Sequence, residues 1–75
     1  MKNNVHIGNE IRKELGKRKL SIAWLAKEIL DDPSNLCKQL GSKFIKHEKL
    51  YEISKALRKD FFALYSQQLA DEIGL

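Results

Sequence analysis

The sequence predicts an all-α fold, a compact domain of four to five helices, and two observations predict it. Apolar residues recur every three or four positions in five segments, which is the spacing of the buried side of a helix. Neither sustained two-residue alternation nor the Asn-Gly and Asp-Gly turns of β-hairpins occur in the sequence. Because a chain of 75 residues has no room for a second core, we expect residues 1–75 to form a single domain.

The first predicted helix covers about residues 6–18. Ile7, Ile11 and Leu15 recur every four positions, and charged residues occupy the positions between them. His6 is expected to cap the start of this helix. The basic run KRK that follows places positive charge near the negative end of the helix dipole.

Two short helices are predicted next, within residues 21–40, and the sequence LDDP separates them. Ser21 can cap the first of the two, whose inward-facing residues are expected to be Ile22, Leu25, Ala26 and Ile29. Asp32 can cap the second, and Pro33 suits a first helical position because it has no N–H to lose. Since helices this short are unstable alone in water, they must pack on the rest of the domain.

A fourth helix is predicted over about residues 46–57 and a fifth over about residues 60–73, capped by Asp60. The fifth has more apolar residues than one helix of so small a domain usually buries. Its stripe of Phe61, Tyr65 and Leu69 is expected to close the core. The remaining apolar residues either contact a second copy, which gives a homodimer, or belong to a slightly over-apolar terminal helix.

Basic residues are unevenly distributed along the chain. Fourteen Lys and Arg against ten Asp and Glu give a formal charge of +4. All fourteen basic residues lie within residues 1–60, whereas residues 61–75 carry only Asp71 and Glu72. A basic body of this kind attracts a polyanion such as nucleic acid, although ordinary soluble proteins also show an excess of this size.

No membrane partner is expected, because no apolar stretch approaches the roughly 20 residues that span a bilayer. The first ten residues lack the apolar centre of a secretion signal, and the single Cys37 has no partner for an intrachain disulfide. These features predict a cytoplasmic protein.

We expect no enzymatic activity, no cofactor and no metal. Cys37 and His47 have no recognisable third orienting group, as a nucleophile and base would need. One cysteine and two histidines, at positions 6, 37 and 47, show none of the paired spacings of a zinc site.

The segment SIAWLAKEILDDPSNLCKQL resembles the helix-turn-helix of small bacterial repressors of the XRE type, which are related to the phage lambda and 434 repressors. The resemblance rests on Leu25 and Ala26 in the first helix of the pair and on Leu36 in the second. It extends over about residues 6–65 through HIGNEIRKEL and LYEISKALRKDFF. It implies a lambda-repressor-like domain whose third helix lies in the major groove of DNA, generally as a two-fold dimer.

The resemblance also implies which residues contact DNA. The start of the third helix is implied to contact bases through Pro33, Ser34, Asn35 and Lys38. Proline offers no donor, whereas Lys38 can donate to guanine, Asn35 can pair with adenine or a phosphate, and Ser34 can bond either kind of partner. The phosphate contacts are implied to come from the start of the second helix and the loop after the third, through Ser21, Ser42, Lys43, Lys46 and His47.

The chain departs from the family pattern around the turn between the two helices. Leu30 stands where the family commonly has glycine, and a left-handed backbone there would strain a leucine by roughly 1 kcal/mol, so a reshaped turn is an alternative. Asp31 and Asp32 would stand near phosphates, which carboxylates repel. Lys46 stands where an acidic cap is expected for the fourth helix.

Other residues can be interpreted either as DNA contacts or as ordinary packing or solvated residues. Trp24 is interpreted as a packing residue rather than a base-stacking one, because it adjoins Leu25 on a short helix. Lys49 is interpreted as a solvated residue more than a DNA contact. The residues 17–19 are weaker candidates for flanking phosphates.

The sequence therefore predicts a transcriptional regulator that binds double-stranded DNA sequence-specifically, a repressor acting as a dimer. The alternative is a protein-interaction module or antitoxin on the same scaffold, with weak or no DNA binding. Leu30, Asp31, Asp32 and Pro33 favour this alternative, as does the apolar last helix.

Overall fold

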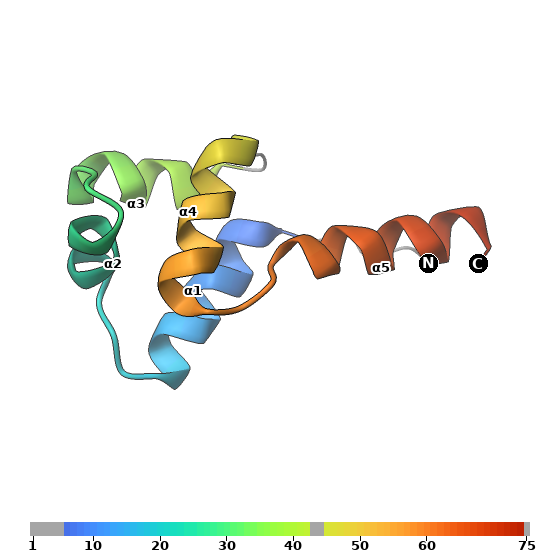
Figure 1. Ribbon diagram of the computed structural model, residues 1–75, viewed down its shortest axis with the longest axis horizontal. Helices are drawn as coiled ribbons and strands as arrows, with labels where there is room; N and C mark the ends of the chain where they lie inside the picture. The colour runs from blue at the N-terminus through green and yellow to red at the C-terminus, as the bar shows by residue number, and fades with distance from the viewer. Residues whose placement is uncertain (1–5, 43–44, 75) are drawn as a thin grey trace.

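A computed structural model describes residues 6–42 and 45–74, and it is all-helical over these residues (Figure 1). The helices are α1 (Ile7–Lys17), α2 (Ile22–Glu28), α3 (Pro33–Gly41), α4 (His47–Leu57) and α5 (Phe62–Ile73). Helix α3 packs against α1 and α2, and α2 also packs against α4. The predicted all-α class is confirmed, and the helix boundaries agree closely with those expected from the sequence.

The helices begin where side chains can accept hydrogen bonds from free backbone N–H groups. His6 Nδ1 accepts from the N–H of Asn9, and Ser21 Oγ accepts from that of Trp24. Asp60 Oδ1 accepts from the N–H of Ala63 at the start of α5, whereas Lys46 makes no side-chain cap at the start of α4. The caps predicted at His6, Ser21 and Asp60 are therefore present.

One apolar core joins the first four helices and the residue before α5. Its buried members are Ile7, Ile11, Leu15, Leu25, Ala26, Leu36, Leu40, Leu50, Ile53, Leu57 and Phe61. Trp24 is half-buried and packs against this core, as the packing interpretation predicted. Because α2 and α3 each supply two members, burial of these side chains stabilises helices that are too short to be stable alone.

Three helices end on a non-glycine residue in the left-handed conformation: Lys19 at φ 58°, Leu30 at φ 56° and Arg58 at φ 51°. After α2, the N–H of Asp31 donates to the carbonyl of Ala26 at 2.8 Å, and that of Leu30 to the carbonyl of Lys27 at 3.3 Å. These two bonds form a Schellman motif. The turn at Leu30 is therefore not reshaped, and the chain keeps a leucine where glycine would be relaxed.

Glu14 ties the end of α1 to the end of α4. Its carboxylate accepts from Arg18 at 2.6 Å and from Lys59 at 2.9 Å, and Arg18 also donates to the carbonyl of Leu57. Hydrogen bonds from Lys59 and then Arg18 lower the pKa of Glu14 to about 2. Arg18 therefore helps to hold the ends of α1 and α4 together.

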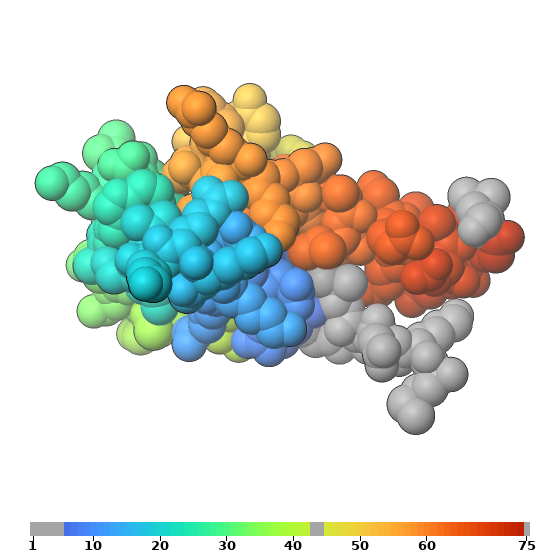
Figure 2. Space-filling model, turned by 90° about the horizontal axis from the view of Figure 1, so that it is seen from below, coloured from blue at the N-terminus to red at the C-terminus, as the bar shows by residue number. Residues whose placement is uncertain are grey.

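Helix α5 projects from the body formed by the other helices (Figures 1 and 2), so that the molecule measures 39 × 21 × 21 Å. The expectation that Phe61, Tyr65 and Leu69 close the core is confirmed for Phe61, which belongs to the core, and for Tyr65, which packs against it, but it is wrong for Leu69. Phe61 is buried and Tyr65 is half-buried, but Leu69 is 56% exposed and Ile73 is 59% exposed. Phe62 and Leu64, which lie outside this stripe, also pack against the core.

None of the helices within the described residues has the length and apolar character needed to cross a membrane.

Candidate nucleic-acid interface

The start of α3 presents polar side chains at the surface of the molecule. Pro33, Ser34, Asn35 and Lys38 are all exposed, as expected from the sequence. Ser34 and Lys38 lie one helical turn apart and therefore on the same side of α3. The opposite side of the helix is fixed to the core by Leu36 and Leu40, which are fully buried.

Asp32 caps α3. Its Oδ2 accepts from the backbone N–H of Asn35 at 3.0 Å, and Pro33 occupies the first turn, where no N–H is needed. This carboxylate lies at the positive end of the helix dipole, which stabilises its charge. The side chains of α3 that face outward, rather than its N-terminal backbone, are therefore the groups available to a ligand.

Asp31 is the centre of a hydrogen-bond network between the α2–α3 turn and α4. Its Oδ2 accepts from Lys49 Nζ at 2.8 Å, and its Oδ1 accepts from the Asp32 N–H at 2.8 Å and from Asn35 Nδ2 at 3.3 Å. The hydrogen bond from Lys49 is the main cause of the lowered pKa of Asp31. Because a cation pairs with it, Asp31 repels phosphate less than the sequence suggests.

Lys49 is correspondingly not a free cation. Its side chain is 26% exposed and forms the ion pair with Asp31, whose side chain is 11% exposed. The interpretation of Lys49 as a solvated residue is wrong, because its ammonium group forms an ion pair with Asp31. The 18 positions between these two residues give no sequence signal for the pair.

Arg12 adds positive charge beside α3, which the sequence did not indicate. Its guanidinium donates to the carbonyl of Cys37 at 3.2 Å and lies 3.7 Å from the Cys37 Sγ. Both residues are exposed. Arg12 therefore connects α1 to the outer side of α3 and leaves further guanidinium N–H groups for an acceptor.

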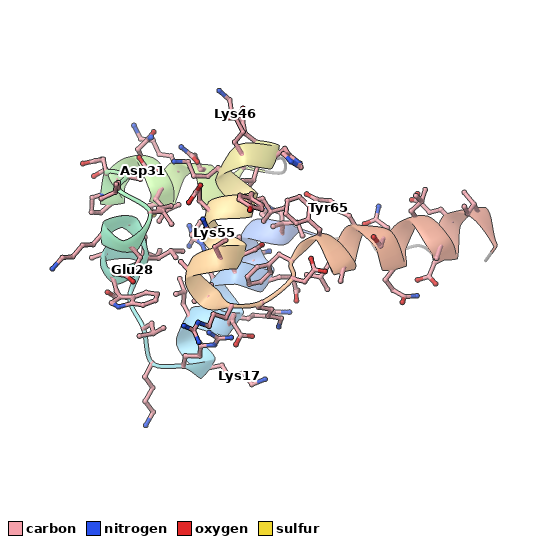
Figure 3. All side chains as sticks on the ribbon, viewed as in Figure 1. Lys17, Glu28, Asp31, Lys46, Lys55 and Tyr65 are labelled. Atoms are coloured by element: carbon pink, nitrogen blue, oxygen red, sulfur yellow. The ribbon has the colours of Figure 1, made fainter. Side chains whose placement is uncertain are left out.

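The residues implied as phosphate contacts come from two segments. Ser21 is exposed at the start of α2, and Ser42, Lys46 and His47 are exposed between the end of α3 and the start of α4. Lys43 lies outside the described residues. Figure 3 shows Lys46 and Asp31 in the upper part of the view, with Lys17 at the bottom. The candidate interface therefore consists of the start of α3 together with flanking cations.

His47 also has a packing role, since its ring lies 5.2 Å from that of Phe62, centroid to centroid. The first half of α4 borders an open hollow of about 520 Å³, lined by Lys46, His47, Glu48, Lys49, Tyr51 and Glu52. Because acidic and basic side chains alternate around it, the hollow does not select an anion. Among the residues that the structure describes, no three side chains are grouped so as to hold a metal ion.

Comparison of the chain with protein-family models, with curated proteins and with solved structures finds no match.

Proposed function

We propose that the protein is a DNA-binding transcriptional regulator that inserts α3 into the major groove, and that it represses transcription by occupying promoter DNA. The observation that carries the proposal is the exposed polar start of α3, held on the core by Leu36 and Leu40. A helix fits the major groove, where each base pair presents a distinct pattern of donors and acceptors. The family resemblance of residues 21–40 supports the same assignment, with α2 and α3 as a helix-turn-helix.

Each group of residues then has a stated role. Ser34, Asn35 and Lys38 contact base edges, and Pro33 packs beside them. Ser21, Ser42, Lys43, Lys46 and His47 contact phosphates, which fixes the position of α3 on the duplex. The net charge of +4 attracts DNA at long range, and the basic residues that produce this charge all lie outside α5.

Binding to duplex DNA at increasing salt concentration tests the proposal. If about five phosphates are neutralised per complex, the slope of log affinity against log salt is about −4.5. Lys46→Ala should weaken binding to every sequence alike and reduce the slope by about 1. Absence of binding to genomic fragments even at low salt would contradict the proposal.

Dimerisation through α5 is part of the same proposal. Tyr65, Leu69 and Ile73 recur every four residues along the projecting helix, and this stripe is half-buried at its start and exposed beyond. Helix α5 carries Asp71 and Glu72 but no Lys or Arg. In a parallel pair the acidic ends of both helices would lie together, so we infer an antiparallel pair, which places them at opposite ends.

Disulfide cross-linking tests the dimer. In a Cys37→Ser background, Leu69→Cys places a thiol at the axis of an antiparallel pair, where it should cross-link on mild oxidation. Gln67→Cys is the control, because residue 67 lies about 200° further back around the helix and faces away from the pair. Equal cross-linking of the two variants, or a monomeric wild-type protein in sedimentation equilibrium, would contradict this geometry.

A protein-interaction module is the second candidate function. Leu30 favours it, because this side chain is 95% exposed at the turn next to α3. Absence of DNA binding combined with stoichiometric capture of one protein partner, lost in Leu30→Ser, would favour this candidate over the first.

A further inference from the structure

The side-chain amide of Asn35 is held in one orientation. Its Nδ2 donates to Asp31 Oδ1 at 3.3 Å. Because an ionised carboxylate only accepts hydrogen bonds, the amide nitrogen must face Asp31 and the carbonyl oxygen Oδ1 must face elsewhere. Asn35 is exposed, so this oxygen and the second N–H of the amide are available to a ligand.

The orientation depends on α4 as well as on the turn. Asp31 is fixed by the Asp32 N–H on one oxygen and by Lys49 Nζ on the other, both at 2.8 Å. Lys49 therefore acts on Asn35 through Asp31 and across 14 residues of chain. The other two residues proposed to contact bases, Ser34 and Lys38, are not held in this way, since their side chains make no hydrogen bond within the described part of the chain.

We propose that Asn35 recognises adenine in the major groove and that Asp31 and Lys49 are positioning residues for this contact. The inference rests on the proposed DNA-binding function and names its specificity. The free Oδ1 accepts from the adenine N6 amino group while the second N–H donates to N7, the pairing that suits an asparagine amide. A phosphate is the poorer partner, because a carboxylate lies beside the amide.

Competition binding with duplexes of one selected site, substituted base by base, measures the contact. Wild-type protein should prefer adenine at one position of each half-site by at least about 5-fold. Asn35→Ala should abolish the preference at that position alone. Lys49→Met should lower the adenine preference toward the Asn35→Ala value. Lys49→Arg should keep the wild-type preference, because arginine can keep the ion pair with Asp31.

Lys13→Met is the matched control. It removes one positive charge and one ion pair, that of Lys13 with Glu10 at 3.3 Å, on α1, which supplies none of the hydrogen bonds described for Asp31. Both variants lose one positive charge, and Lys49→Met should lose more affinity because Asp31 is left without its cation, but only Lys49→Met should lose the adenine preference. Thermal unfolding of each variant verifies that it is folded.

The outcomes separate this inference from the proposed function. Specific DNA binding whose base preferences are unchanged in Asn35→Ala overturns the adenine contact and leaves DNA binding intact. An adenine preference that is lost in Asn35→Ala but unchanged in Lys49→Met overturns the positioning role. Failure of the folded wild-type protein to bind any duplex overturns the proposed function itself.

Discussion

Gly8 in α1 lies directly against the carbonyl of Leu40 in α3, so closely that a Cβ atom on residue 8 would be 1.7 Å from that oxygen. Only glycine permits this approach of the two helices. The contact sets the separation between α1 and α3, and it therefore helps to position the helix whose outer side carries Ser34 and Lys38.

Gly8→Ala should accordingly destabilise the protein by about 2 to 3 kcal/mol, because the added methyl group meets backbone that can move only by shifting α3. Gly16→Ala is the control, since a Cβ there has nothing within 4 Å. That change should stabilise α1 by up to about 1 kcal/mol. Urea unfolding of both variants measures the difference, and similar stability changes for the two would contradict the close contact.

Leu30→Gly should stabilise the protein by about 0.5 to 1 kcal/mol. The residue has φ 56° and is 95% exposed, so glycine relieves the left-handed strain and little packing is lost. Leu30→Ala keeps a Cβ and should change stability little. If thermal unfolding shows that the glycine variant is no more stable than the alanine one, the turn is not strained.

The stability supplied by Glu14 should depend on pH. Folding lowers its pKa from 4.5 to about 2, so the native state releases this proton more readily than the unfolded chain does. The contribution is therefore fully present above about pH 4.5 and disappears as the pH falls toward 2. Unfolding of wild type and Glu14→Gln should differ most at neutral pH and converge in acid.

Glu10→Gln is the control for this pH series. Glu10 lies on the same helix, and its ion pair with Lys13 is exposed. Its loss should cost less than about 1 kcal/mol. A stability difference between wild type and Glu14→Gln that stays constant down to pH 2 would contradict the ion-pair account.

Local signals predicted most of the fold. Apolar spacing located the helices, and the cap residues His6, Ser21 and Asp32 located three helix starts, because each acts within one turn of its own position. The exposure of Ser34 and Lys38 followed from the same reasoning, since Leu36 and Leu40 turn the opposite side of α3 inward.

Contacts between distant residues were not predictable in this way. Asp31 pairs with Lys49, and Glu14 with Lys59, across 18 and 45 positions, and nothing local in the sequence marks either pair. The direction of α5 was likewise missed. Its apolar period matches that of a buried helix, and only the tertiary structure shows that α5 projects from the body and that Leu69 is 56% exposed.

Selection of bound sequences from random duplex DNA tests the central claim, that the outer side of α3 reads bases, most directly. Wild-type protein should enrich one palindromic motif with half-sites about one helical turn apart, and Ser34→Ala and Lys38→Ala should flatten its base preferences. Lys17→Ala, at the bottom of the view in Figure 3 and away from Asp31 and Lys46, should select the wild-type motif. Enrichment of no motif, or of the same motif by wild type, Ser34→Ala and Lys38→Ala, would contradict the account.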